Sequence, residues 1–309
     1  MKQAALIVLA LILLLASCMS EADKLEKANL ELGSKKNPIK MYFVPSMEAS
    51  TVVTSGEAIA AWLEQETGYK FKVAVPTSYA AVVEAIGAYQ ADVAWLPTFA
   101  YVLAEEKYEA EVQFMTVRNG LNKYCGQFVA RADSGIDSLS QIEGKVVAYT
   151  DAASTSGYIY PSAILKQQGI NPARYTLAGG HPQAITAVYN GTADVACTYW
   201  SPPDASGKPM DAREKLLETY PDVFSKLKIV ALTDSIPNDT VTFRRGMPDE
   251  VKTKLVQALE KFAGNKDGQA IMKELYDIDG LTRATDADYD IVRQTLKALD
   301  KDPRQFLKD

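Results

Sequence analysis

The sequence predicts an α/β fold of two lobes, in each of which a mainly parallel sheet is flanked by helices. From residue 38 onward, apolar segments of strand length alternate with segments of helical periodicity, which is typical of α/β domains. The segment AAVVEAIGAYQADVAW at 80–95 is matched by QAITAVYNGTADVACT at 183–198, and a repeat of about 100 residues indicates two units of the same build. The 309-residue chain is also too long for one ordinary core.

The N-terminus has the layout of a secretion signal over residues 1–17. Lys2 is followed by an apolar run from Ala4 to Ala16, which has the length of a signal-peptide core and is too short for a membrane span. The run ends in the sequence LASC, typical of a bacterial lipobox, in which cleavage precedes Cys18 and lipid chains on this cysteine hold the protein on a membrane outside the cytoplasm. A plain signal peptide with an incidental cysteine is the alternative. Residues 18–37 are polar and charged and predict a tether.

Composition narrows the class of ligand. The formal net charge is −6, and an acidic protein outside the cell argues against nucleic acid as a partner and requires any anion to be held by local donors. A single histidine and the absence of metal-ligand spacing predict no metal site and no cofactor. Cys125 and Cys197 lie in apolar, strand-like sequence, so they are either buried free thiols or one disulfide.

The first lobe begins with alternating strands and helices. Its helical segments carry apolar residues at helical spacing, such as Ile59 and Leu63. The predicted strands are 39–44, 71–75 and 92–96, and the predicted helices are 51–66 and 79–89. This alternation gives parallel strands whose carboxyl ends open onto ligand crevices.

The second lobe repeats this order and is joined to the first by two crossings. Its predicted strands are 144–149 and 194–197, and its predicted helices are 156–168 and 184–189. Extended segments at 129–132 and 231–241 predict the crossings, and the helical C-terminal part should pack back on the first lobe. We therefore expect residues 38–130 and 240–309 to form lobe 1 and residues 131–239 to form lobe 2. Two crossings make a hinge, which places the expected ligand site in the cleft between the lobes.

The turn Ser154-Thr155-Ser156-Gly157 is the strongest candidate for an anion site. It follows a predicted strand and opens a predicted helix, where unpaired N–H groups and the helix dipole favour a tetrahedral oxyanion. The three hydroxyls supply further donors. The alternative is a simple helix cap, which needs only one hydroxyl.

Tyr79 and His181 hold equivalent positions in the two halves of the repeat. Each comes just before or at the start of the helix that leads into the Ala-Asp-Val-Ala motif, and Pro182 marks a helix start. Both residues are therefore expected to face the cleft, with His181 in contact with the ligand.

Aromatic and acidic residues suggest a second kind of ligand. Aromatic side chains follow the third strand of each half, and Asp204 and Asp239 are candidate acceptors for a cationic group. The aromatic set is Trp95, Phe99, Tyr101, Tyr199 and Trp200. Of these, Trp95, Phe99, Tyr199 and Trp200 could form a cage for an organic cation, and an aminoalkylphosphonate would combine the two sites.

Enzymatic activity is the least favoured alternative. Ser154 or Ser156 could act as a nucleophile with His181 as base, but the chain has no Gly-x-Ser-x-Gly elbow and no evident third member of a triad. We predict a binding protein and not an enzyme. Whether such a protein serves a transporter or a sensor kinase depends on its partner.

Several motifs together resemble the PhnD-like phosphate/phosphite/phosphonate-binding proteins of ABC transporters, which have a periplasmic-binding-protein type II-like fold. The resemblance runs from about Ile39 to Leu275. The motifs are Ser154-Thr155-Ser156-Gly157, Gly169-Ile170-Asn171-Pro172, His181, Gly191-Thr192-Ala193-Asp194 and Ser235-Ile236-Pro237-Asn238-Asp239.

The resemblance implies roles for individual residues. The Ser-Thr-Ser turn and His181 would hold the phosphorus oxyanion, Tyr79 would close over it, and Tyr101 corresponds imperfectly to a second tyrosine of the family. It also implies a monomer that delivers a small anionic ligand to ABC permease subunits.

Overall fold

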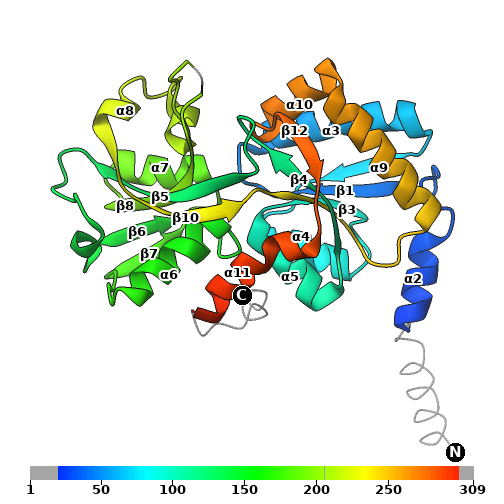
Figure 1. Cartoon of the computed structure of the whole chain (residues 1–309), viewed down its shortest axis with the longest axis horizontal. Coiled ribbons are helices and arrows are strands. Elements are labelled where there is room, and N and C mark those ends of the chain that lie inside the picture. Colours follow the sequence, from blue (N-terminus) through cyan, green and yellow to red (C-terminus); the bar gives the residue numbers. More distant parts are fainter. Residues whose placement is uncertain (1–19, 205, 299–309) are drawn as a thin grey trace, which may run out of the picture.

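The computed structural model describes residues 20–204 and 206–298, and within these residues the chain forms two six-stranded sheets. Figure 1 shows the two sheets side by side, each with helices on both faces. We call the part built on the first sheet lobe 1 and the part built on the second sheet lobe 2. The predicted two-lobed α/β fold is confirmed.

Lobe 1 contains both early and late segments of the chain. Its strand order is β12-β4-β11-β3-β1-β2. The strands are β1 (Ile39–Phe43), β2 (Phe71–Ala74), β3 (Val93–Leu96), β4 (Glu111–Val117), β11 (Thr240–Phe243) and β12 (Gly280–Arg283). One face carries α3 (Ala49–Thr67), α9 (Asp249–Gly264) and α10 (Lys266–Tyr276), and the other carries α4 (Tyr79–Gly87) and α5 (Thr98–Tyr108).

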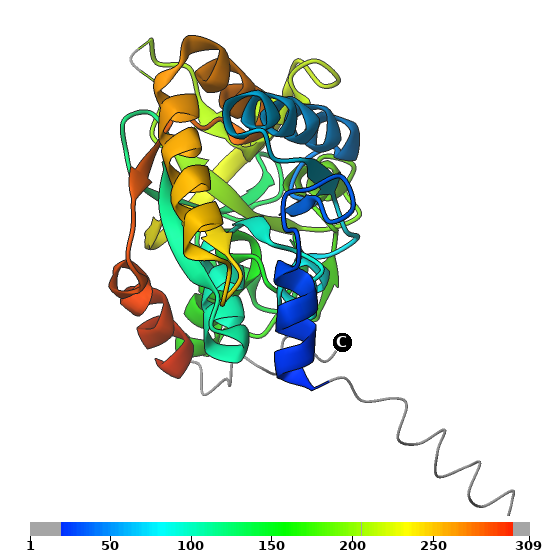
Figure 2. The same ribbon diagram turned by 90° about the vertical axis from the view of Figure 1, so that its right-hand side faces the viewer.

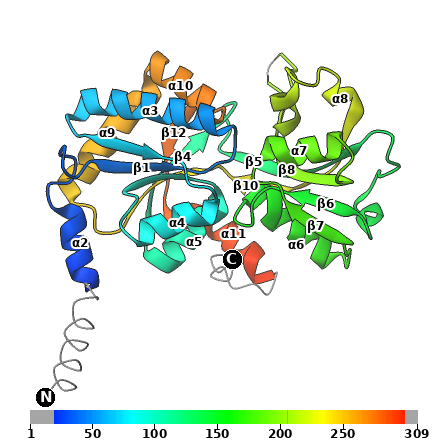
Figure 3. The ribbon, with the colours of Figure 1, turned by 180° about the vertical axis from the view of Figure 1, so that it is seen from behind.

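Lobe 2 is formed by the middle of the chain. Its strand order is β10-β5-β8-β6-β7, with β9 paired to β8. The strands are β5 (Lys123–Arg131), β6 (Val146–Tyr149), β7 (Arg174–Leu177), β8 (Val195–Ser201), β9 (Met210–Asp211) and β10 (Leu227–Pro237). The helices are a π-helical turn (Thr155–Ile159) continued by α6 (Tyr160–Gln167), then α7 (His181–Tyr189) and α8 (Val223–Lys226). Figure 3 shows α6 and α7 on opposite faces of this sheet.

The sheets are mixed, whereas the sequence predicted mainly parallel ones. The parallel pairs are β1 with β2 and β3 in lobe 1, and β6 with β7 and β8 in lobe 2. The strands next to the crossings form antiparallel pairs. These strands are β4 and β5 at the first crossing and β10 and β11 at the second. Strand–helix units give parallel neighbours, but a strand that crosses from the other lobe joins without a helix and can run the opposite way.

The first crossing lies at residues 118–122, upstream of the predicted 129–132. The sequence predicted the boundary between lobe 1 and lobe 2 at residues 130 and 131. Because β5 belongs to the second sheet, this boundary falls at the end of β5 and not at the crossing. Arg118 and Leu121 exchange backbone hydrogen bonds of 2.9 Å around Asn119 and Gly120, which both have positive φ, 52° and 71°. This geometry is a type I′ turn, for which Asn-Gly is a strong signal.

The second crossing is short and is bonded to the first. Asn238 and Asp239 are the two residues between β10 and β11. The Asn238 side chain donates to the carbonyls of Thr116 and Leu121, each at 2.9 Å. The two crossings are therefore held side by side, as a hinge requires.

Residues 20–37 pack on lobe 1 and do not form the predicted tether. They include α2 (Glu21–Asn29), which begins with a capping box of Ser20 and Asp23. Asn29 donates to the Gly246 carbonyl at 2.9 Å, and Leu32 is buried in the lobe 1 core. Figure 2 shows α2 against the outer end of lobe 1. None of the helices in the described ranges has the length and apolar character needed to cross a membrane. Cys18 lies outside the described residues.

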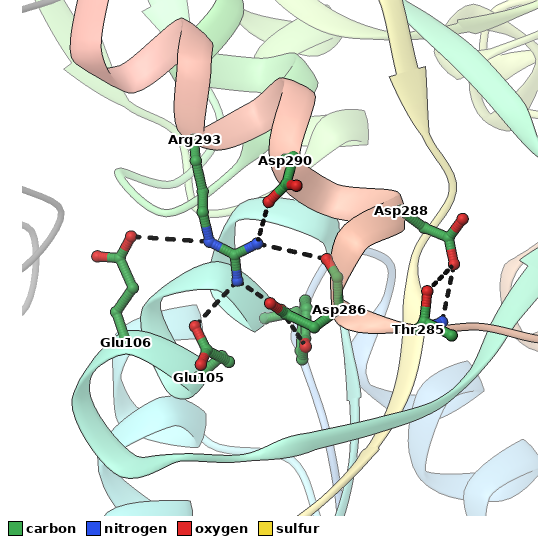
Figure 4. Close-up of polar contacts among 8 residues, drawn as sticks. Glu105, Glu106, Thr285, Asp286, Asp288, Asp290 and Arg293 are labelled. Atoms are coloured by element: carbon green, nitrogen blue, oxygen red, sulfur yellow. Dashed lines mark hydrogen bonds and ion pairs between the residues drawn. The ribbon is translucent and has the colours of Figure 1, made fainter.

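The last described helix, α11 (Asp290–Ala298), lies below the junction of the lobes (Figure 1). Val292 and Leu296 join a core cluster that includes Tyr160 and Ala163 of α6 as well as residues of α5. Figure 4 shows Arg293 surrounded by carboxylates of α5 and of the segment that leads into α11; Arg293 Nη2 lies 2.9 Å from Glu105 Oε2. The C-terminal helix thus contacts both lobes.

Candidate functional site

A cavity lies between the two lobes, lined by residues of both. The loops after β1, β3 and β4 and the start of α4 supply one wall, and the π-helical turn, the start of α7 and the end of β8 supply the other. Its lining side chains include Ser46, Tyr79, Trp95, Arg118, Asn119, Tyr124, Ser154, Ser156, His181, Tyr199, Asp239, Tyr276 and Asp277.

The predicted hydroxyl turn forms part of the lobe 2 wall. Ser154 caps the π-helical turn, and its hydroxyl accepts from Gly157 N at 3.1 Å. Ser154 and Ser156 are both buried and both line the cavity. The first backbone N–H groups of a helix lack intrahelical acceptors. Two hydroxyls at the start of a helical turn therefore lie at one wall of the cavity.

Thr155, the third hydroxyl of the turn, has a different role from the predicted one. It is fully buried and does not line the cavity. Its Oγ1 accepts from the backbone N–H of Phe99 at 2.8 Å. Because Phe99 lies in the first turn of α5, Thr155 of lobe 2 satisfies a helix N–H group of lobe 1.

Tyr79 and His181 are the first residues of α4 and α7 and line the cavity from opposite lobes. The backbone N–H of Tyr79 donates to Asp151 Oδ2 at 3.2 Å, and that of His181 donates to the Ser46 carbonyl at 3.4 Å. Each lobe therefore accepts a hydrogen bond from the first N–H group of a helix of the other lobe. The two equivalent positions of the sequence repeat thus make equivalent contacts between the lobes.

His181 is neutral and has an unused ring nitrogen. Burial, with the nearby positive charge of Arg118, lowers the pKa of His181 to about 3. Its ring packs edge-to-face on Tyr199, with centroids 4.9 Å apart. Nδ1 has no hydrogen-bond partner among the described residues. A buried polar atom of this kind requires a partner from a ligand or water.

The tyrosines around the cavity are protonated. Burial raises the pKa of the Tyr79, Tyr124 and Tyr276 hydroxyls above the ordinary value, and nearby carboxylates, such as Asp151 beside Tyr79, add to the rise. Each phenol is therefore a hydrogen-bond donor at neutral pH. The Tyr276 hydroxyl is already used, since it donates to the Val44 carbonyl at 2.7 Å.

Besides Thr155, two predicted site residues do not line the cavity. Tyr101 is fully buried, and its hydroxyl donates to Asp286 Oδ1 at 2.7 Å. Tyr124 of β5, which the sequence did not single out, does line the cavity. Asp204 lies in an exposed turn, where its Oδ1 accepts from Ser206 N at 2.8 Å and from Lys208 N at 3.0 Å.

Asp239 lines the cavity, but its carboxylate already forms an ion pair with Arg118 of the same chain. Arg118 Nη2 lies 2.7 Å from Asp239 Oδ2. Burial opposes the charge of Arg118, and the attraction of Asp239 outweighs it, so the pKa of the guanidinium lies above its ordinary value. Arg118 and Asn119 had not been predicted as site residues. The Asn-Gly signal for a tight turn could have placed both at the hinge.

Only some of the predicted aromatic residues lie in the cavity wall. Trp95 and Tyr199 line the cavity, whereas Phe99 and Trp200 do not. Cys125 and Cys197 are free thiols, so the two are not a disulfide. No group of three or more histidine, cysteine, aspartate and glutamate side chains in the described ranges could hold a metal ion.

Sequence comparison places this architecture in a family. The model of the phosphonate periplasmic substrate-binding protein of ABC transporters matches residues 41–289. The phosphate-import protein PhnD of Mycolicibacterium smegmatis is 29% identical over 306 residues, with 92% of each chain covered. The phosphonates-binding periplasmic protein of Escherichia coli is 23% identical over 221 residues, covering 69% of this chain and 62% of that one.

Solved structures share the fold. A binding protein component of an ABC phosphonate transporter from Pseudomonas aeruginosa superposes with a TM-score of 0.74 at 24% identity, over 85% of this chain and 87% of that one. PhnD1 of Prochlorococcus marinus, solved with methylphosphonate, gives 0.73 at 15% identity, over 85% and 98%. With the family model matching most of its length, the chain belongs to the phosphonate-binding family of ABC transporter substrate-binding proteins, which are binding proteins and not enzymes.

Proposed function

We propose that the protein captures a small phosphorus oxyanion, such as phosphate, phosphite or a phosphonate, in the cavity between its lobes and delivers it to an ABC permease. The observation that carries the proposal is the convergence of donors from both lobes. Ser154, Ser156 and His181 line the cavity from lobe 2, and Tyr79 lines it from lobe 1. A tetrahedral oxyanion offers enough acceptor oxygens to bond all four.

The energetics of such a site are adequate. Hydrogen bonds to a charged group contribute about 1.5–3 kcal/mol each. Three or four of them, less the cost of association, correspond to affinities of about micromolar or tighter. The anion would also supply the acceptor that His181 Nδ1 lacks.

Ligand capture would be coupled to lobe closure. A ligand that bonds both walls favours the state in which the walls are close. The bonds from Tyr79 N to Asp151 and from Phe99 N to Thr155 join the same two lobes, so they would form together with the ligand contacts. The closed surface is then the form that a permease recognises.

A thermal-shift and calorimetric panel tests the proposal. It compares phosphate, phosphite and methylphosphonate with sulfate and choline on the chain from Ser20 onward. We expect a rise in Tm with at least one phosphorus oxyanion. The variant Ser154→Ala/Ser156→Ala should weaken its binding by more than about 100-fold.

Ser138 and Ser140 provide a matched control. They are also two residues apart in lobe 2, with hydroxyls 3.0 Å from each other, but they are not part of the cavity wall and their contact is exposed. Ser138→Ala/Ser140→Ala should bind like the wild type. If choline alone raises Tm, or if no compound does, the proposed function is wrong.

The proposal includes a lipid anchor at Cys18 and a monomeric protein outside the cytoplasm. Family membership supports an extracytoplasmic location. The LASC sequence supports acylation. Mass spectrometry of the mature N-terminus should find a diacylated or triacylated Cys18, and Cys18→Ser should release the protein from membranes. Light scattering of the released protein should give the mass of one chain.

A further inference from the structure

We infer that Arg118 is a specificity-determining residue that selects against ligands with an ammonium group and favours a substituent with oxygen acceptors. The inference rests on the proposed function, because it concerns the part of the ligand beyond the phosphorus oxyanion. A carboxylated phosphonate such as phosphonoacetate is the class of ligand that fits best.

Arg118 is fixed in its position by three partners. Nη2 pairs with Asp239 Oδ2 at 2.7 Å, Nε donates to the Tyr276 carbonyl at 2.9 Å, and Nη1 donates to Thr116 Oγ1 at 3.2 Å. The Arg118 side chain is 15% exposed and that of Asp239 is 25% exposed. Such a partly buried pair is costly to break, because the partner that remains loses its counter-charge.

The other carboxylate of the cavity is paired as well. Asp277 Oδ2 lies 2.6 Å from Lys215 Nζ, which comes from lobe 2. Asp239 and Asp277 are the two carboxylates among the described residues that line the cavity. An incoming ammonium group would have to displace an internal cation or lie close to Arg118, and both are unfavourable.

The cavity also has polar donors without acceptors. Asn119 Nδ2 and Trp95 Nε1 are buried, line the cavity, and have no hydrogen-bond partner among the described residues. Asn119 follows Arg118 in the turn from Arg118 to Leu121 at the first crossing, and Trp95 lies on β3. Both nitrogens donate only, so an oxygen-bearing substituent would satisfy them and an ammonium group would not.

Calorimetric titration of the wild type with three ligands tests the ranking. The ligands are phosphonoacetate, methylphosphonate and 2-aminoethylphosphonate, which differ in the substituent on phosphorus. We expect phosphonoacetate to bind at least as tightly as methylphosphonate. 2-Aminoethylphosphonate should bind at least about tenfold more weakly than methylphosphonate.

Substitution of Arg118 should reverse the discrimination. Arg118→Met leaves Asp239 free for an ammonium group, so the ratio of the Kd of 2-aminoethylphosphonate to that of methylphosphonate should fall by about tenfold or more. Arg118→Lys keeps a cation and should keep the wild-type order. If Arg118→Met does not fold, Arg118→Met/Asp239→Asn removes both charges, and its ratio should fall toward one.

Arg131→Met is the control, since Arg131 forms a similar pair with Asp133 on the exposed surface and does not line the cavity. The inference is overturned if the wild type binds 2-aminoethylphosphonate as tightly as methylphosphonate, or if Arg118→Met leaves the ratio unchanged. Either result, with methylphosphonate still bound, leaves the proposed function intact. Failure of all three ligands to bind would instead count against the proposed function itself.

Discussion

The hydroxyl of Thr155 accepts a hydrogen bond of 2.8 Å from the backbone N–H of Phe99, and this bond joins the two lobes beside the cavity. Thr155→Val keeps the shape of the side chain and removes this acceptor from the buried N–H, at a cost of about 1–3 kcal/mol. Since the bond requires the lobes to be in contact, the cost should appear in ligand affinity. Calorimetry should show a Kd for methylphosphonate that rises by about tenfold or more.

Thr155→Ser retains the hydroxyl and should bind within a few-fold of the wild type. The pair of variants separates lobe contact from ligand contact, because Thr155 does not line the cavity. Wild-type affinity in Thr155→Val would show that this bond does not contribute to closure.

His181 should make stability depend on pH. Its pKa of about 3 in the folded state is below the ordinary value of 6.5, so the unfolded chain binds a proton first as the pH falls. The stability that neutral His181 allows is fully present above pH 6.5 and is lost as the pH falls toward 3. The free energy of unfolding should drop by up to about 1.4 kcal/mol per pH unit in this window.

His181→Asn isolates this contribution from that of other groups. Asp151, for example, has a pKa raised by burial, and its protonation acts with the opposite sign. Urea unfolding without ligand at pH 7, 6, 5 and 4 should show a flatter profile for His181→Asn than for the wild type. Parallel profiles would mean that the pKa of His181 is the same in the folded and in the unfolded protein.

The internal repeat at 80–95 and 183–198 was the most informative sequence feature for locating the cavity residues. Tyr79 and His181 were placed by their equivalent positions, and both line the cavity at helix starts. Asp92 and Asp194, which follow the same helices, also act alike. Their carboxylates accept from the backbone N–H of Lys40 and of Val146, each at 2.8 Å, and so tie neighbouring strands together.

Contacts between distant segments were beyond what the sequence pattern could show. The sequence of three adjacent hydroxyl residues does not reveal which of them contacts the other lobe. In the structure it is Thr155. The partner of Tyr101 is Asp286, 185 residues away. Arg118 was missed because it is one of many arginines until the hinge turn places it beside Asp239.

Gly157 should not accept a side chain. A Cβ at this position would overlap Thr150 Oγ1 and lie 2.8 Å from Thr150 Cβ. Gly157→Ala should therefore lower the free energy of unfolding by about 1–3 kcal/mol and weaken anion binding, because the turn that carries Ser154 must shift. Chemical denaturation and calorimetry measure the two effects.

Gly264 gives the matched substitution, since a Cβ there meets nothing within 4 Å. Gly264→Ala should cause no loss of stability or affinity. If the clash is the cause, Gly157→Ala/Thr150→Gly should bind more tightly than Gly157→Ala alone. Equal loss in the single and double variants would contradict this explanation.

Asn29 should contribute to stability although it lies in the segment predicted to be a tether. It accepts from Arg244 Nη2 at 2.7 Å, and Arg244 is fully buried and paired with Asp92. Asn29→Ala removes one acceptor from this buried guanidinium, so we expect unfolding to become about 1–3 kcal/mol easier. Glu26→Ala, on the exposed side of the same helix, should change stability by less than about 0.5 kcal/mol. Urea unfolding of both variants decides the matter. Equal stability would mean that α2 is a detachable spacer, whereas the expected difference would mean that α2 is an integral part of lobe 1.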